Sequence, residues 1–217
     1  VPPDTYRFNF QVEGARVPNP VGTTWSEERT GINSTFETIG PEGTFQSYDP
    51  AVPHGIVSEF EYWSSTLQAK RRAHIYTPPG YMNGTRHYPV LYLVHGAGDS
   101  DDSWTSVGRA HYIIDNLIAA GKAEPMIIVM PFGHTPDRPD VPVLANRDFG
   151  QDYLNDLIPQ IEANFRTLNT AEMRAMAGLS MGGAHTIRYG LTRPELFHYI
   201  GIFSMGLGVQ GDDREIA

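Results

Sequence analysis

The sequence predicts an α/β fold in which helices pack on both faces of a mostly parallel sheet. Nearly continuous apolar segments at 88–94 and 126–130 are typical of parallel strands that are buried on both faces. Segments with the periodicity of helices separate such strands, and this alternation indicates a doubly wound domain. The first 50 residues are rich in turn formers instead, so a short β-rich segment precedes that domain.

Length and composition restrict the function before any motif is considered. The 217 residues correspond to one domain of about 150 residues with a remainder. Asp and Glu (25) outnumber Lys and Arg (16), and the net charge of −9 argues against nucleic acid as a partner. The chain has no cysteine, which excludes a disulfide framework, a thiolate nucleophile and a cysteine-ligated metal.

The sequence also argues against a membrane partner, since no apolar run approaches the roughly 18 residues of a membrane span. The chain starts at Val1 without an initiator Met and without the apolar core of a signal peptide. We therefore expect a secreted, extracellular protein whose signal peptide has been removed.

The first 56 residues are expected to be β-rich or irregular. Alternating residues at 6–12 predict a strand, and Pro and Gly residues follow at short intervals. This stretch is too short for the roughly seven strands of a closed sandwich. We expect 1–50 to be the end of a β module and 40–56 to be a linker.

The main domain begins with two extended segments at 56–63 and 71–77, which are expected to pair in an antiparallel manner. Pro78 and the residues that follow it end the second strand. Beyond the buried strand at 88–94, we expect further strands at 126–130, 175–177 and 199–203. Helices are expected between them: one over 113–118 that ends at Gly121, one over 148–166 that is kinked by Pro159, and one after Ser180.

The most specific motif is Gly178-Leu179-Ser180-Met181-Gly182, which fits the Gly-x-Ser-x-Gly nucleophile elbow. In this elbow a buried strand turns abruptly into a helix, and the serine occupies the strained corner. Glycines two residues before and after the serine avoid collisions between strand and helix. An apolar strand precedes this motif and a helical segment follows it, so the sequence predicts that Ser180 is a nucleophile.

A nucleophilic serine needs donors for the oxyanion that forms on the substrate carbonyl. The backbone N–H of Met181 lies at the start of the predicted helix, where free N–H groups favour negative charge. The loop after the strand at 88–94 reads His95-Gly96-Ala97-Gly98, and its glycines allow close approach of the backbone to substrate. We assign the second donor to the backbone N–H of Ala97.

Several sequence blocks resemble carbohydrate esterase family 1, the feruloyl and acetyl xylan esterases of plant cell-wall degradation, which are related to esterase D. The blocks are His95–Gly98, Trp104, Gly108–Ala110, Asp115–Ile118, Pro125–Pro131, Asp152–Leu154, Leu157–Pro159 and Gly178–Gly183. The resemblance implies an α/β-hydrolase fold over residues 51–217, with Ser180 as nucleophile and Met181 and Ala97 as oxyanion donors. It also implies that residues 1–50 are the last strands of an immunoglobulin-like, carbohydrate-binding β-sandwich module.

The general base is the point at which the sequence departs from that family. In α/β-hydrolases the triad acid and His follow the serine in the chain, and here only His185 and His198 do so. His185 is carried about 7 Å along the helix that Ser180 starts, and His198 precedes a strand and so falls at the opposite end of the sheet. Neither is expected to take the serine proton, and Asp212 and Asp213 are weak candidates for the acid. We therefore expect a hydrolase domain that lacks its C-terminal part and is weakly active alone.

Residues that follow strands ending at the catalytic edge are candidates for the substrate cleft. They are His95, Trp104, His111, Phe132 and His134. A structural hydrogen-bonding role is the alternative for His95, and a surface or helix-capping role is the alternative for His111 and His134. No spacing typical of a metal site is present, so no cofactor is implied.

The sequence thus favours a serine carboxylic-ester hydrolase that acts on feruloyl or acetyl esters of plant cell-wall polysaccharide. Its partner would be a polysaccharide or a small ester substrate. One alternative is a non-catalytic polysaccharide-binding or scaffold protein on the same fold, although a binding protein has no need of a strained serine. Another is an esterase completed by a base from a second chain, in a homo-oligomer formed through surfaces that truncation exposes.

Overall fold

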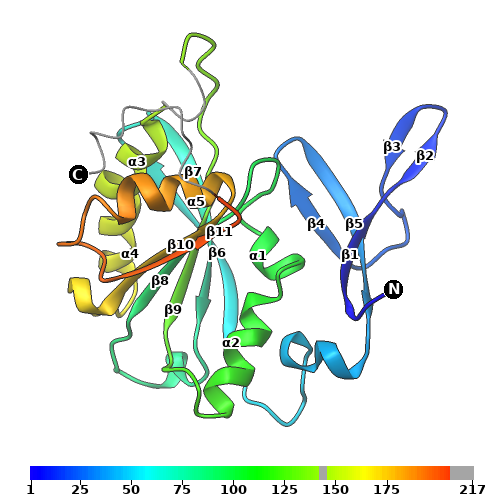
Figure 1. Ribbon diagram of the computed structural model, residues 1–217, viewed down its shortest axis with the longest axis horizontal. Coiled ribbons are helices and arrows are strands. Elements are labelled where there is room, and N and C mark those ends of the chain that lie inside the picture. Colours follow the sequence, from blue (N-terminus) through cyan, green and yellow to red (C-terminus); the bar gives the residue numbers. More distant parts are fainter. Residues whose placement is uncertain (142–145, 206–217) are drawn as a thin grey trace.

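A six-stranded mixed sheet forms the centre of the computed structural model, which describes residues 1–141 and 146–205 (Figure 1). Its strands are β6 (Ile56–Ser64), β7 (Ala69–Thr77), β8 (Val90–Val94), β9 (Ile127–Pro131), β10 (Arg174–Leu179) and β11 (Tyr199–Phe203), in the order β11-β10-β8-β9-β7-β6. The four strands β8 to β11 are parallel, and β6 and β7 form the antiparallel pair. The predicted α/β class with a mostly parallel sheet is confirmed.

Helices cover both faces of this sheet and create two apolar cores. On one face, α1 (Ser103–Ser106) and α2 (Ala110–Ala119) cover a core that includes Leu93, Ile114 and Met130. On the other face, α3 (Asp148–Asp152), α4 (Ile158–Asn164) and the helix α5 (Met181–His185) surround a larger core. α2 ends just before Gly121, whose φ of +66° is the left-handed stop that the sequence predicts.

The helical segment from 148 is interrupted, as the sequence predicts, near Pro159. A π-helical turn (Tyr153–Leu157) joins α3 to α4, and Pro159 lies in the first turn of α4. Because proline has no N–H to donate to the preceding turn, the local hydrogen-bond pattern changes there. Short helical turns at Pro41–Gln46, Tyr81–Asn83 and Ala171–Met173, and a π-helical turn at Thr186–Gly190, complete the described helices.

A separate sheet, which we call the N-terminal sheet, lies beside α1 and α2 (Figure 1). It consists of β1 (Asp4–Phe8), β4 (Trp25–Glu28) and β5 (Gly31–Thr38), in the antiparallel order β1-β5-β4. The strand expected over 6–12 is divided between β1 and β2 (Phe10–Val12), which forms a hairpin with β3 (Ala15–Val17). The expected linker at 40–56 packs against α2, where the Asn116 amide donates to the carbonyls of Phe45 and Ser47.

Within the described residues, no helix combines the length and apolar character that crossing a membrane requires.

Candidate active site

Ser180 occupies a strained corner between β10 and α5. Its φ of 51° and ψ of −110° lie outside the regions that non-glycine residues normally adopt, at a cost of about 1–3 kcal/mol. A Cβ at Gly178 would overlap the carbonyl group of Gly182, and a Cβ at Gly182 would overlap that of Val94. The side chain of Ser180 is exposed. The geometry is therefore that of a nucleophile elbow, built as the motif predicts.

The loop that follows β8, residues His95–Asp99, passes directly beside the serine, and we call it the oxyanion loop. A Cβ at Gly96 would lie 3.7 Å from both the Ser180 Cβ and the Leu179 carbonyl oxygen. The Gly182 N–H donates to the His95 carbonyl at 3.1 Å, which fixes the loop to the start of α5. The structure thus places the loop that carries Ala97 beside Ser180, and Met181 follows Ser180 directly as the first residue of α5.

His95 is buried, and its ring forms hydrogen bonds with backbone groups, which agrees with the structural hydrogen-bonding role given above as the alternative to a place in the substrate cleft. One ring nitrogen, Nδ1, lies 2.8 Å from the Gly96 carbonyl, and Nε2 accepts from the Gly133 N–H at 2.8 Å. Burial lowers the pKa of His95, so the ring is neutral and donates from Nδ1. Both nitrogens are occupied by backbone groups.

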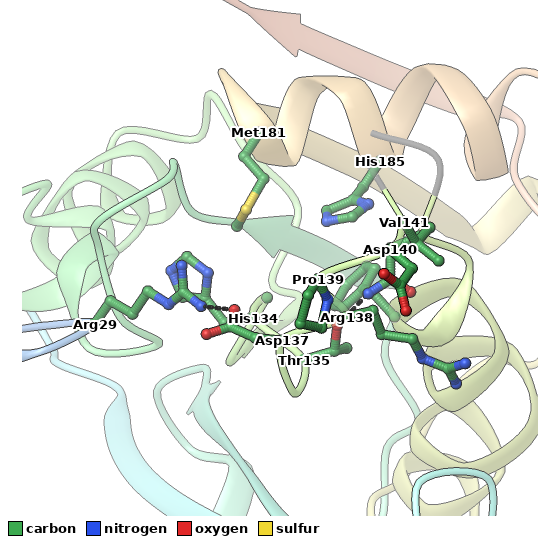
Figure 2. Close-up of a pocket in the computed structure, with 13 residues that line it drawn as sticks. Arg29, His134, Thr135, Asp137, Arg138, Pro139, Asp140, Val141, Met181 and His185 are labelled. Carbon is green, nitrogen blue, oxygen red and sulfur yellow. Dashed lines mark hydrogen bonds and ion pairs between the residues drawn. The ribbon is translucent and has the colours of Figure 1, made fainter. Parts of the chain in front are cut away.

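A pocket of about 520 Å³ opens next to Met181 (Figure 2). Its lining includes Gly133, His134, Phe149, Met181 and His185, and Arg29 and Arg138 reach it from opposite sides. This volume is within the usual range for small-molecule sites, which is about 300–1,000 Å³.

Of the five predicted cleft residues, His134 lines this pocket. His95 and Phe132 lie directly behind His134, with ring centroids 5.2 and 5.3 Å from its own. Trp104 packs against Phe203 at 6.3 Å, on another side of the serine, and His111 packs against Tyr112 at 3.9 Å on α2. Neither Trp104 nor His111 is among the residues that line this pocket.

Two neutral imidazoles face the pocket. Burial, with the nearby His95 and Arg29, lowers the pKa of His134 to about 4, and its Nε2 lies 3.1 Å from the Asp99 carbonyl oxygen. Burial, with the nearby Arg188, lowers the pKa of His185 to about 3. His185 stacks on Phe149 at 4.2 Å, and its buried Nε2 has no hydrogen-bond partner. A neutral imidazole has a proton on one ring nitrogen and a lone pair on the other, so Nε2 is a polar group that is left to pair with a ligand.

The sequence excludes His185 as the base, and it does not predict that His185 or Arg29 lines the pocket. The signal for His185 was its spacing, since a residue four positions after Met181 lies on the same face of a helix. Arg29 follows β4 in the N-terminal sheet and forms an ion pair with Asp137 at the pocket. No local pattern places Arg29 there.

All eight histidines lie in the described residues, and none of them is hydrogen-bonded to the Ser180 hydroxyl. His198 lies just before β11, which starts beside Ala175, and is 3.9 Å from Glu172, at the end of the sheet remote from Ser180. Asp212 and Asp213, the weak candidates for the acid, lie outside the described residues. Within the described part, no three acidic or His side chains gather as metal ligands would.

Comparison with known proteins relates this site to esterases. A family model described as "Putative esterase" matches residues 64–208. An endo-1,4-beta-xylanase/feruloyl esterase of Xylanibacter ruminicola is 39% identical over 210 residues, which are 94% of this chain and 29% of that protein. An esterase of Mycobacterium tuberculosis is 35% identical over 133 residues, 60% of this chain and 28% of its own length. The chain thus spans less than a third of these relatives.

The fold is also that of solved esterase structures. The CE1 ferulic acid esterase of Anaeromyces mucronatus, in complex with ferulic acid, has a TM-score of 0.70 at 25% identity, covering 81% of this chain and 67% of that one. The feruloyl esterase module from Clostridium thermocellum, complexed with sinapinate, has a TM-score of 0.63 at 22% identity and covers 82% and 64%. These matches confirm the predicted α/β-hydrolase fold.

Proposed function

The chain belongs to the esterase family, and from this premise we propose that it acts as a serine carboxylic-ester hydrolase on acyl esters of plant cell-wall polysaccharide. The observation that carries the proposal is the strained Ser180 corner beside the oxyanion loop. The names of the feruloyl esterase relatives support the substrate class.

The proposed reaction proceeds through an acyl-enzyme. The Ser180 Oγ attacks the ester carbonyl, and the N–H groups of Met181 and Ala97 stabilise the oxyanion that forms. The sugar hydroxyl leaves with a proton, and an acyl ester on Ser180 remains. Water then attacks this ester, releases the carboxylic acid and returns the proton to Ser180.

The pocket beside Met181 supports a feruloyl rather than an acetyl ester. It is far larger than an acetyl group needs, and the rings of His134 and His185 line it. A phenolic hydroxyl both donates and accepts hydrogen bonds, so that of a ferulate ring is a suitable partner for the unpartnered Nε2 of His185. We therefore propose that this pocket receives the hydroxycinnamoyl group.

Proton transfer from Ser180 remains the weak step of this chain acting alone. Since none of its imidazoles is hydrogen-bonded to the serine, we propose that the base comes from another group, a second chain included. Oxyanion hole and binding alone retain on the order of 10³–10⁴-fold acceleration over water in serine hydrolases that lack triad members. Slow but measurable turnover is expected.

The test is to label the chain with a fluorophosphonate, locate the adduct by mass spectrometry and assay p-nitrophenyl acetate and methyl ferulate. We expect slow modification of Ser180, and Ser180→Ala should abolish both labelling and turnover. Ser58→Ala, which changes an exposed serine on β6, is the matched control and should behave as wild type. Turnover that survives Ser180→Ala would refute the nucleophile, and labelling as fast as in complete triads would refute the missing base.

A second candidate function, polysaccharide binding, is favoured by the aromatic surface of the N-terminal sheet. Tyr6 stacks on Phe36 at 5.4 Å, Phe8 lies edge-on to Phe36 at 5.8 Å, and Phe36 and Phe10 are 43% and 48% exposed. Flat exposed rings of this kind pack well against sugar rings. We propose that residues 1–50 retain the sugar-contacting face of a carbohydrate-binding module.

The test is affinity gel electrophoresis of the wild-type chain and of Phe36→Ala in gels that contain arabinoxylan. The proposal is supported if Phe36→Ala is retarded less than the wild type while Ser180 labelling is unchanged. Equal retardation of the two proteins would refute it.

A further inference from the structure

The N-terminal sheet makes direct backbone contact with the oxyanion loop. The Arg29 N–H donates to the Gly98 carbonyl at 2.8 Å, and Glu28 forms an isolated antiparallel bridge with Asp99. The end of β4 therefore continues onto the loop that carries the proposed Ala97 donor. A segment about 70 residues earlier in the chain thus shapes the edge of the active site.

Arg7 adds a side-chain contact from β1. Its Nη1 lies 2.6 Å from the Asp99 Oδ1, and its Nη2 donates to the Ser103 hydroxyl at 2.9 Å. The Ser26 hydroxyl oxygen accepts from Nε at 3.0 Å and from Nη2 at 2.8 Å, so the guanidinium is held in one orientation. Arg7 and Asp99 are each about one quarter exposed, which screens the pair only in part.

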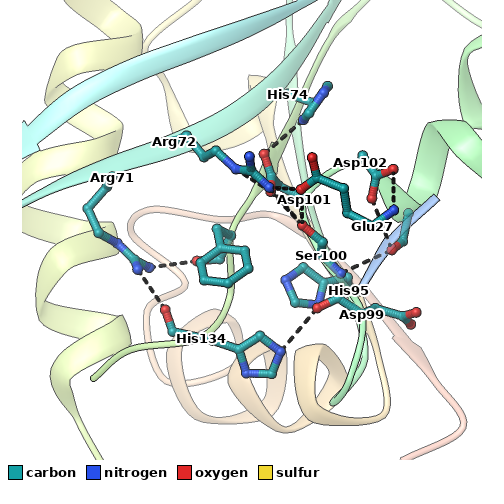
Figure 3. A network of polar contacts seen from close by, with 12 residues as sticks. Glu27, Arg71, Arg72, His74, His95, Asp99, Ser100, Asp101, Asp102 and His134 are labelled. Carbon is teal, nitrogen blue, oxygen red and sulfur yellow. Dashed lines mark hydrogen bonds and ion pairs between the residues drawn. The ribbon is translucent and has the colours of Figure 1, made fainter. Parts of the chain in front are cut away.

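The surrounding contacts fix the same region to the central sheet (Figure 3). The Glu27 N–H donates to the Asp102 carboxylate at 2.9 Å, and Arg72 of β7 forms ion pairs with both Glu27 and Asp101. His134 contacts the Asp99 carbonyl from the pocket side. In contrast to Asp101, which pairs with Arg72 of the central sheet, the Asp99 carboxylate pairs with Arg7 of the N-terminal sheet.

The oxyanion loop needs such contacts because its own sequence is permissive. Gly98 has a φ of +88°, and Ala97 and Gly98 are exposed. Glycine loses more conformational freedom on ordering than other residues, while an oxyanion donor must be held within about 0.5 Å of its working position. His95 secures the start of the loop, and the N-terminal sheet secures its end.

Charge gives Arg7 a second effect. The Asp99 Oδ2 is 3.4 Å from the position of a Gly96 Cβ, and that position is 3.7 Å from the Ser180 Cβ. The Oδ2 therefore lies within about 7 Å of the Ser180 Cβ, where a negative charge opposes the oxyanion that forms in the transition state. The guanidinium of Arg7 offsets this charge.

We propose that Arg7 is a positioning residue of the esterase reaction, which acts through Asp99 to hold the oxyanion loop and to offset the carboxylate charge. This inference rests on the proposed function. It makes the N-terminal sheet part of the catalytic unit.

The test compares Arg7→Ala with Glu37→Ala. Glu37 pairs with Arg109 and also joins the N-terminal sheet to the main domain, but it does not touch the oxyanion loop. Loss of a charge-assisted contact to the loop should lower kcat of Arg7→Ala about tenfold with KM within about twofold, while Glu37→Ala keeps the wild-type kcat. Hydrogen exchange over residues 95–100 should become faster in Arg7→Ala alone.

Two further variants separate positioning from a general loss of structure. Arg7→Lys should recover part of the rate, and Asp99→Asn in the Arg7→Ala background should do so by removing the unpaired carboxylate. The proposal is overturned if Arg7→Ala and Glu37→Ala match in both kcat and exchange, or if neither rescue raises the rate. Should the wild-type chain hydrolyse no ester, the proposed function fails, and the exchange comparison still decides whether Arg7 holds the loop.

Discussion

At the scale of single residues, the turn at Ser180 depends on two glycines, because any side chain at these positions would collide with neighbouring backbone. Gly178, Gly182 and Val94 approach so closely that no Cβ fits between them, and this closeness is what turns the chain at Ser180. The Gly-x-Ser-x-Gly spacing encodes these contacts locally, which is why Ser180 could be predicted from sequence. His185 and Arg29 could not, because their place at the pocket depends on packing between distant segments.

We predict that Gly182→Ala destabilises the protein by more than about 2 kcal/mol, because its methyl group would overlap the Val94 carbonyl. Urea unfolding followed by circular dichroism measures this loss. Gly31→Ala is the control, since a Cβ there meets nothing within 4 Å, and its stability should stay close to wild type. Equal stability of the two variants would contradict the overlap.

Substrate selectivity is a second residue-scale prediction. His185→Phe should raise KM for methyl ferulate about fivefold, because the nitrogen that we propose pairs with the phenolic hydroxyl is lost. KM for methyl cinnamate, which lacks that hydroxyl, should be nearly unchanged. His198→Phe, at an exposed site remote from the pocket, serves as the control. A parallel rise in KM for both esters would show that His185 only shapes the pocket.

At the scale of elements, burial decided what the sequence could predict. The apolar strands β8, β9 and β10 were evident because both faces contact core. β4 and β5 were not evident from the sequence, because the residues that they bury include the polar Ser26, Asn33 and Ser34. A strand whose inner face is polar lacks the alternation on which prediction relies.

The contact between β7 and the segment after the oxyanion loop should respond to pH. Burial lowers the pKa of His74, but the hydrogen bond and charge of Asp101 outweigh it and hold the pKa above the usual 6.5. For Asp101, burial raises the pKa, yet His74 and Arg72 hold it below 3.8. The His74–Asp101 pair therefore contributes its full stability between pH 3.8 and pH 6.5, the ordinary pKa values of the two groups. This contribution is lost as pH rises through the raised pKa of His74, and also as pH falls through the lowered pKa of Asp101.

His74→Gln should consequently cost more stability at about pH 5 than at about pH 8. Thermal unfolding of both proteins at the two pH values gives the comparison. A difference in Tm that is independent of pH would mean that His74 stays neutral beside Asp101.

At the scale of the whole molecule, ion pairs join the N-terminal sheet to the main domain. Ion pairs that cross between them are Arg7–Asp99, Arg29–Asp137, Arg72–Glu27 and Arg109–Glu37. The predicted division at residues 50 and 51 is thus a boundary in sequence that the folded chain bridges with ion pairs. Extracellular location and association of copies of the chain stay predictions.

Salt should therefore loosen the N-terminal sheet before it affects the main domain. Raising NaCl from about 0.05 M to about 1 M screens partly exposed ion pairs, so limited proteolysis within residues 40–56 should become faster. The fragment that contains residues 56–205 should remain resistant, because its core is apolar. Cleavage that does not change with salt would show that apolar contacts hold the sheet in place.

The pairing of Arg7 with Asp99 also bears on how the protein folds. The two residues are 92 positions apart, and closing a loop of that length is entropically costly. The N-terminal strands leave the ribosome first, yet they cannot reach their final contacts until β8 and the residues after it have been synthesised and ordered. The oxyanion loop is thus expected to acquire its working shape among the last steps of folding, so that a partly folded chain exposes Ser180 without the means to use it.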